Sequence, residues 1–250
     1  MIRVRPLLSS LALVGVTLPL DVPMRIPPPT DQFANPEYNG RFSFTRIQYF
    51  GGGFRGRGGS SWAHDWPDGD INMQSILDEV TGLEVNLGRS NVFTLDDPAI
   101  FQNPIIYISE PGYWRMSEAE VAGLRSYLLK GGFVIFDDFE ENQWYNFEEQ
   151  LMRALPEYEL IELPFTHPIF DSFFHMDKVD VPHPLVSGIT PHYYGVFEDN
   201  DPEQRMMVMV NFNNDLAEYW EFSGRGYFPM DLTNDAWRLG VNYIIYGLTH

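Results

Sequence analysis

"GGFVIFDDFEE", residues 131–141, is the stretch that decides the fold of this chain. Four apolar residues, Phe133 to Phe136, end abruptly in Asp137 and Asp138, and two glutamates follow closely. A continuous apolar run of this length is typical of a strand that is buried on both faces of a parallel sheet. The sequence therefore predicts a central strand that ends in a cluster of carboxylates with no Lys or Arg beside it.

The segments on either side of this strand have helical patterns. Ser117 and Glu120 have the spacing of a capping box, and they begin a helix that ends at Lys130, just before two glycines. After the strand, "NQWYNFEEQLMRAL" (142–155) is amphipathic, and Pro156 stops it. A strand between two helices is the repeating unit of an α/β fold.

Further elements extend this alternation in both directions. Strands are predicted at 41–50, 83–88, 103–109, 158–163 and 205–212, and helices at 71–80, 96–101 (one turn) and 234–250. Asp70 is predicted to N-cap the helix at 71–80. The order predicts a mostly parallel central sheet with helices on both faces. Residues 164–200, rich in Pro and His, are predicted to form an elaborated loop region.

The composition excludes several classes of function. The chain has 250 residues, which is enough for one large domain or two small ones. Its formal net charge of −19 repels phosphate backbones, so no nucleic-acid partner is expected, and it disfavours adhesion to anionic lipid. The chain contains no cysteine, which excludes disulfides, thiolate metal sites and cysteine nucleophiles.

The N-terminus has the layout of a secretory signal, with Arg3 and Arg5 ahead of the mostly apolar run 7–20. An uncleaved anchor that associates residues 1–20 with a membrane, or an ordinary structural segment, are the alternatives. Residues 21–40 are rich in Pro, Asn and Asp, which is typical of an extended arm. We therefore predict a signal or anchor segment and arm over 1–40, a single domain over 41–250, and a periplasmic or exported protein.

Many separate blocks, in order, resemble the bacterial domain-of-unknown-function 4159 family. They include "FTRIQY", "WAHDWP", "SEPGYW", "LRSYLLKGGFVIFDDF", "HPIFDSFF", "YYGVFEDND", "NNDLAEYWEFS" and "GVNYIIYGLTH". The resemblance covers about residues 41–250, and members of this family often carry export signals. It implies a branch of the class I glutamine amidotransferase-like fold, which is a flavodoxin-like three-layer α/β sandwich. It implies no activity.

The amidotransferase-like superfamily carries a cysteine nucleophile on a sharp turn after a central strand. "KGGFVIFDDF" is similar to that strand and turn, and here Asp137 and Asp138 stand at the turn. Since the chain has no cysteine, it is not a glutamine amidotransferase.

Several candidate site residues follow predicted strands and should meet at one edge, because ligands of open α/β sheets bind beyond the carboxyl ends of the strands. The catalytic candidates are Asp137, Asp138, His64 and His167. The candidate ligands of a divalent metal are His64, Asp65, Asp138 and His167. The alternative is structural: aspartates cap helices and turns, and His167 in "HPIF" anchors the 164–200 loop.

The remaining binding candidates are Arg55, Arg57, Asp65, Ser109 and Glu110. The two arginines lie in the glycine-rich loop "GGGFRGRGG" (51–59), where they could receive an anionic ligand or a carboxylate of the protein itself. The loop lacks the phosphate-binding signatures, and a flexible or partner-ordered loop is the simpler interpretation. Ser109 follows a buried strand as a hydrolase serine does, but it has no G-x-S-x-G context.

Three hypotheses on function result. The first is a non-catalytic exported domain that binds a protein partner or a small ligand and needs no cofactor. The second is a hydrolase based on a divalent metal or on carboxylate and His residues. The third is a structural subunit that docks on a membrane complex through residues 1–40. The first two differ in geometry, since the hydrolase requires His64, Asp65, Glu110 and one of the aspartates 137–138 to converge.

Overall fold

A computed structural model describes residues 34–51, 61–176 and 181–250. Seven strands form one sheet, in the order β3-β1-β4-β6-β9-β8-β7. These strands are β1 (Thr45–Ile47), β3 (Asn91–Phe93), β4 (Ile105–Ser109), β6 (Phe133–Asp137), β7 (Ile161–Glu162), β8 (His192–Phe197) and β9 (Met206–Phe212). The first five in sheet order are parallel, and β8 pairs antiparallel with both of its neighbours, β9 and β7. The predicted mostly parallel α/β sheet is confirmed.

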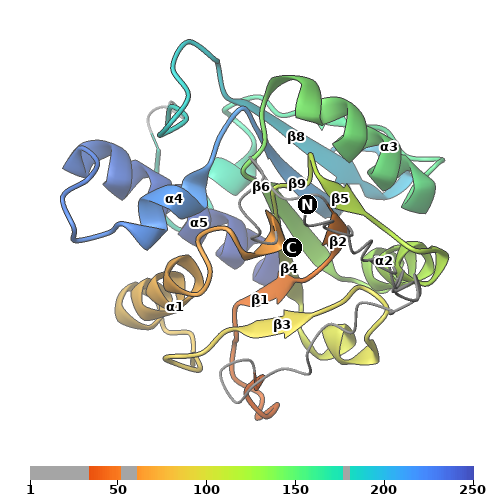
Figure 1. The fold of residues 1–250 in the computed structure, drawn as a ribbon, viewed down its shortest axis with the longest axis horizontal. Helices are drawn as coiled ribbons and strands as arrows, with labels where there is room; N and C mark the ends of the chain where they lie inside the picture. Colours follow the sequence, from red (N-terminus) through yellow and green to blue (C-terminus); the bar gives the residue numbers. More distant parts are fainter. Residues whose placement is uncertain (1–33, 52–60, 177–180) are drawn as a thin grey trace, which may run out of the picture. The chain divides into compact units, whose positions relative to one another are not determined.

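Helices cover both faces of the sheet. The α-helices are α1 (Asp68–Val80), α2 (Glu118–Leu129), α3 (Trp144–Ala154), α4 (Leu216–Glu221) and α5 (Met230–Thr249). One core packs α1, α4 and α5 against one face, and a second core packs α2 and α3 against the other. Figure 1 shows the two helical layers on opposite sides of the sheet. The architecture is that of a three-layer flavodoxin-like sandwich.

The central strands are buried on both faces, as their continuous apolar sequences require. Along β6, Phe133 and Ile135 enter the core of α5, whereas Val134 and Phe136 enter the core of α2 and α3. The alternation follows from the two-residue period of a strand. All five residues of β6 are buried, including Asp137 at its end.

Two local signals work as the sequence predicts. Ser117 and Glu120 form the capping box that begins α2. After α2, the backbone of Gly131 has a φ of 106°, which a residue with a side chain rarely adopts. A Cβ on Gly132 would lie 2.3 Å from the ring of Tyr127, so the turn into β6 requires glycine there.

Shorter elements were missed or misplaced. The strand predicted at 83–88 is only an isolated bridge at Val85, and β3 lies further along the chain. The helix predicted from residue 71 begins at Asp68, so Asp70 is not the N-cap but a buried residue of the first turn. The helix α4 and strand β8 were not predicted, and α5 begins at Met230 rather than at residue 234.

Smaller elements complete the fold. Short strands β2 (Phe50–Gly51) and β5 (Trp114–Arg115) pair with each other, and the 3-10 helices are η3 (Ser61–Ala63), η4 (Pro98–Gln102), η5 (Glu141–Gln143), η6 (Pro168–Phe170) and η7 (Glu198–Asn200). Within the predicted arm, the Asn35 side chain pairs with both the N–H and the carbonyl of Val92. Across the described part of the chain, no helix has both the length and the apolar character needed to cross a bilayer.

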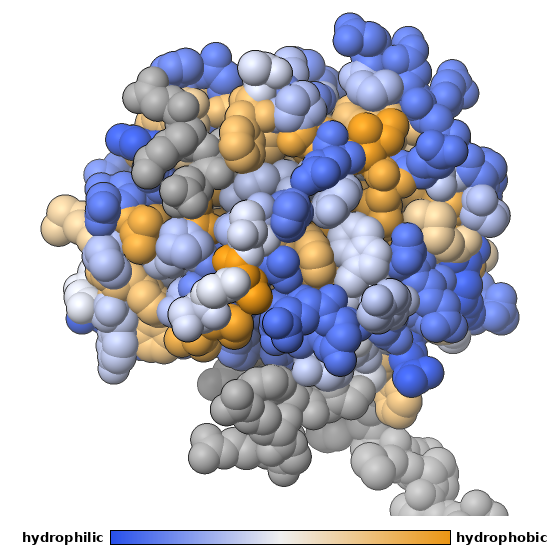
Figure 2. All heavy atoms as spheres, turned by 90° about the horizontal axis from the view of Figure 1, so that it is seen from above, coloured by the Kyte–Doolittle hydropathy of each residue, from blue (hydrophilic) through white to orange (hydrophobic). Residues whose placement is uncertain are grey.

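Hydrophilic side chains predominate on the face that Figure 2 presents, with apolar side chains in small groups between them. Among the aromatic residues 219–228, Tyr219 and Trp220 are buried, whereas Tyr227 is 70% exposed. The aromatic richness of the chain therefore serves mainly the two cores.

Candidate functional site

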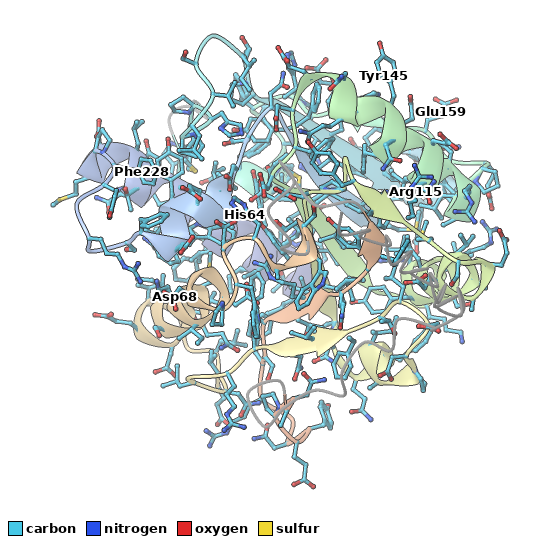
Figure 3. The ribbon with its side chains drawn as sticks, in the orientation of Figure 1. His64, Asp68, Arg115, Tyr145, Glu159 and Phe228 are labelled. Atoms are coloured by element: carbon cyan, nitrogen blue, oxygen red, sulfur yellow. The ribbon has the colours of Figure 1, made fainter. Side chains whose placement is uncertain are left out.

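Polar side chains from five parts of the chain, most of them acidic or histidine, meet at the carboxyl edge of the parallel strands. His64 and Asp65 lie between β1 and α1, Ser109 ends β4 and Glu110 follows it, and Asp138 follows β6. Asp215 and Glu218 come from the start of α4, after β9, and His183 comes from the connection between β7 and β8. Figure 3 shows His64 beside α4 and the ends of the central strands, with oxygen atoms close by.

The centre of the site is the pair of His64 and Asp138. Nδ1 of His64 lies 2.8 Å from Oδ2 of Asp138, and the same oxygen accepts a hydrogen bond of 3.1 Å from the Ser109 hydroxyl. Asp138 has a backbone φ of 63°, and Asp65 and Glu110 have φ values of 59° and 46°. Left-handed backbone is uncommon for such residues, and it aims all three side chains out of sharp turns toward one another.

A buried arginine holds the segment that carries His64. Arg46 of β1 is fully buried and forms an ion pair of 2.6 Å with Asp70. Its Nη1 donates to the backbone carbonyls of Trp62 and His64, at 3.1 and 2.8 Å. The guanidinium also lies 4.9 Å from the centre of the Tyr107 ring. The charge of Arg46 is thus paired with Asp70, and its other hydrogen bonds fix the backbone that carries His64.

Asp137 lies beside the site and has a structural role. Its Oδ2 accepts hydrogen bonds from the Tyr107 hydroxyl (2.8 Å) and from the backbone N–H groups of Leu216 (2.9 Å) and Ala217 (3.2 Å). The carboxylate therefore satisfies two of the free N–H groups at the start of α4. Of the two aspartates that were predicted as catalytic, Asp138 faces the site and Asp137 anchors a helix.

Four further carboxyl groups surround His64 and Asp138, and all are buried: Asp65, Glu110, Asp215 and Glu218. Asp215 N-caps α4 by accepting from the N–H of Glu218 at 3.0 Å. Among the described residues, neither oxygen of Asp65 has a hydrogen-bond partner. One of the two oxygens of Glu110 also lacks one. Asp65 instead faces His64, with 3.4 Å between its Oδ2 and Nδ1 of the imidazole. It also lies near the carboxyl group of Glu218, which can donate a hydrogen bond only when it is protonated.

Burial and mutual repulsion shift the protonation of these groups. Burial, followed by the charge of Asp138, raises the pKa of Glu110 to about 7. Burial also raises the pKa of Asp65 and that of Asp215 well above the ordinary range. For His64 burial acts in the lowering direction, but the hydrogen bond to Asp138 and the charges of Asp65, Asp138 and Glu110 raise the pKa to about 10. Without a cation, the cluster is thus a site of excess negative charge that holds protons.

His183 was not among the predicted site residues. Its Nδ1 accepts hydrogen bonds from the backbone N–H groups of Leu185 and Val186, both at 3.2 Å. Its side chain is only 3% exposed, and burial lowers the pKa of the imidazole. Nε2 lies 3.9 Å from a Glu140 carboxylate oxygen, which is beyond hydrogen-bond distance. No local sequence pattern identifies His183 as a site residue, because its position depends on the path of the long connection between β7 and β8.

His167 is not brought to the site. Its ring lies between Phe197 and Tyr246, with 5.7 Å from its centre to each, and its Nδ1 caps η6 by accepting from the N–H of Ile169. Phe197 pairs with Met206 at the start of β9, which is the opposite edge of the sheet. His167 lines a cavity of about 560 Å³ there, together with His250 and Tyr246. Arg55 and Arg57 lie outside the described residues.

The chemistry of the remaining groups fits a metal ion. Three sets of side chains each bring their ligand atoms within 4.8 Å of one another: His64 with Asp65, Asp215 and Glu218; His64 with Glu110 and Asp138; and Asp138 with His183 and Asp215. Carboxylate oxygens with one imidazole nitrogen form a donor set that suits Mn, Fe or Zn. Within the ranges that the structure describes, no other group of three or more such residues has this geometry.

The fold and site define an α/β protein of flavodoxin-like architecture with an acidic, histidine-containing site beyond the carboxyl ends of its strands. The model of a domain of unknown function, DUF4159, matches residues 43–248, and the chain belongs to this family. No curated protein matches the chain.

Proposed function

We propose that this protein binds a divalent metal cation at the strand-end site, in a ligand set of His64, Asp65, Asp215 and Glu218. The observation that carries the proposal is Asp65, a carboxylate whose side chain is fully buried and whose two oxygens have no hydrogen-bond partner in the described part of the chain. Nδ1 of His64, at 3.4 Å from Oδ2, is close to Asp65 but does not replace these hydrogen bonds. A buried carboxyl group without hydrogen bonds is costly, whereas a metal ion satisfies several carboxylates at once.

The neighbours of Asp65 support the same proposal. His64, Asp215 and Glu218 offer their ligand atoms within 4.8 Å of one another and of Asp65. Asp215 and Glu218 are fixed by the first turn of α4, which Asp137 anchors to β6. The carbonyl of His64 is fixed by the buried Arg46. A donor set that rigid elements hold in place needs little rearrangement to receive an ion.

Metal analysis tests this function directly. The full-length protein, stripped with a chelator and dialysed, should bind Mn²⁺ or Zn²⁺ with a saturable heat in calorimetry. Asp65→Asn keeps the size of the side chain but removes its charge, and it should lower the affinity by about 10-fold or more. Asp171→Asn is the matched control, because Asp171 is an exposed aspartate that also pairs with a histidine. Equal binding by the Asp65→Asn variant and the wild type would refute the proposal.

In this proposal the protein is a non-catalytic accessory domain, and the cation takes part in binding its ligand. A metal-dependent hydrolase is the second candidate, and the pair of His64 and Asp138 favours it, because a histidine that a carboxylate orients can transfer a proton. A bound metal would activate a water molecule in that case. Turnover of p-nitrophenyl acetate or p-nitrophenyl phosphate that requires the metal and is lost in His64→Ala would favour the hydrolase.

Two parts of the proposal rest on the sequence. Export through the N-terminal signal, with membrane association of residues 1–20 or docking on a membrane complex as alternatives, concerns a segment that lies outside the described residues. Fractionation of cells that produce the full-length chain tests it. The relation to the glutamine amidotransferase-like superfamily likewise rests on the resemblance around "KGGFVIFDDF".

A further inference from the structure

We infer that the N–H of His183 binds an oxygen atom of an oxyanion ligand, a carboxylate or a phosphate, which enters the site together with the divalent cation. This inference rests on the proposed cation site and names the class of ligand that the same site takes. It starts from the hydrogen bonds of one buried histidine, which the proposed ligand set does not use.

The backbone fixes which nitrogen of His183 carries the hydrogen. Two N–H groups, of Leu185 and Val186, both donate to Nδ1 at 3.2 Å. A nitrogen that accepts these bonds has its lone pair in the ring plane and no hydrogen of its own. The hydrogen of the neutral imidazole is therefore on Nε2, and this atom is a donor rather than a metal ligand.

His183 borders the site, and its Nε2 is buried without an acceptor. The side chain is 3% exposed, and Nε2 has no hydrogen-bond partner among the residues that the structure describes. A ligand atom of His183 lies within 4.8 Å of those of Asp138 and Asp215. Glu140 offers the carboxylate at 3.9 Å, but its other oxygen is held by the Gln143 side chain at 2.9 Å. Buried N–H groups normally have a partner, so an acceptor from outside the chain fits this position.

The charges around His183 define when that acceptor can bind. Asp138 and Asp215 would repel a free anion, and both are buried, with a carboxylate oxygen of each within 4.8 Å of a ring nitrogen of His183. A divalent cation at the neighbouring carboxylates reverses this field and can share the oxygens of the ligand. The N–H of His183 then supplies a directed hydrogen bond on the other side of the bound oxygen. The oxyanion should therefore bind only to the metal-loaded protein.

Calorimetry with inorganic phosphate and with acetate tests the inference, in two separate titrations. The Mn²⁺-loaded, full-length protein should bind at least one of the two anions, and the metal-free protein should bind neither. His183→Leu removes the donor and should weaken anion binding by about 10-fold or more. His183→Gln keeps an N–H donor near the position of Nε2 and should restore most of the affinity. Both variants should bind Mn²⁺ like the wild type, which also shows that they fold.

The outcomes separate this inference from the proposed function. If the wild type binds no Mn²⁺, the cation site itself is refuted, and the inference is refuted with it. If Mn²⁺ binds but neither anion does, or if His183→Leu binds the anion like the wild type, only the inference is overturned. Loss of Mn²⁺ from both folded His183 variants would make His183 a metal ligand and would also overturn it. Saturation by phosphate alone, or by acetate alone, identifies the type of oxyanion.

Discussion

Nδ1 of His64 lies 2.8 Å from Oδ2 of Asp138, although the two residues are 74 positions apart in the chain. Two connections at the carboxyl edge of the sheet produce this contact. His64 stands between β1 and α1, and Asp138 stands in the sharp turn that ends β6. With β4 and its terminal Ser109 between these strands, the three side chains meet above the carboxyl edge of the sheet. Because of this contact, the acidic turn after β6 is part of a site and not a solvated strand end.

The pair predicts a specific effect of Asp138→Asn. The variant keeps the shape of the side chain but removes the charge that orients His64, so metal affinity should fall by about 10- to 100-fold, as when other carboxylate partners of metal-binding histidines are changed. Calorimetric titration with Mn²⁺ measures it. Glu162→Gln is a suitable control, since Glu162 also contacts a histidine, His192, in an exposed pair. An unchanged affinity in Asp138→Asn would remove Asp138 from the site.

The neighbouring aspartate should behave differently. Asp137→Ala leaves the Tyr107 hydroxyl and the N–H groups of Leu216 and Ala217 without their acceptor, so the free energy of unfolding should fall by about 1–3 kcal/mol. Hydrogen exchange at the amides of Leu216 and Ala217 should accelerate. Asp138→Ala is the control and should leave both amides protected. If the two variants exchange alike, Asp137 does not anchor α4.

Long apolar elements could be predicted because their apolar residues follow a regular pattern that indicates burial. The strands β4 and β6 and the helix α2 are in this class. The same holds for the site residues at the ends of these strands, Ser109, Glu110 and Asp138. The strand β8 was missed because one of its faces is half-exposed, so His192 and Tyr194 interrupt the apolar pattern. The helix α4 has six residues, which is too short to show a helical period.

The remaining site residues depend on tertiary structure to different degrees. Asp215 and Glu218 have the D-x-x-E spacing of a helix start after a strand, so this signal could have placed both at the carboxyl edge. His183 has no such signal, because the long connection between β7 and β8 carries it to the site, and residues 181–191 around it form no helix or strand that would give a sequence pattern. His167 looked equivalent in sequence, but its segment packs at the opposite edge of the sheet, against Phe197 and Tyr246.

The buried arginine that holds His64 should be important for stability. Arg46→Met leaves Asp70 as an unpaired buried charge, and the free energy of unfolding should fall by about 3–5 kcal/mol. Arg225→Met is the matched control, because Arg225 also pairs with an aspartate of α1, Asp68, but in an exposed position. That variant should change stability by less than about 1 kcal/mol. Urea denaturation measures both, and equal effects would contradict the role of Arg46.

The stability of the metal-free protein should decrease as the pH rises. Burial raises the pKa of Asp137 to about 6 and that of Glu110 to about 7, so the folded state holds protons that the unfolded state releases. Their contribution is fully present below the pKa values of the unfolded chain, which are near 4, and is lost as the pH rises to about 7. His64 acts in the same direction at higher pH: against the lowering effect of burial, its acidic neighbours raise its pKa to about 10.

Urea denaturation in the presence of a chelator, at intervals from pH 5 to pH 8, measures this dependence. Glu110→Gln cannot release a proton, so its stability should fall less steeply between pH 5 and pH 7 than that of the wild type. A saturating divalent cation should remove most of the decline, because it binds the charged form of the cluster and stabilises the folded state as the carboxyl groups ionise. A stability that instead rises from pH 5 to pH 8 without metal would show that the buried carboxyl groups are already ionised at pH 5, in contradiction to the raised pKa values.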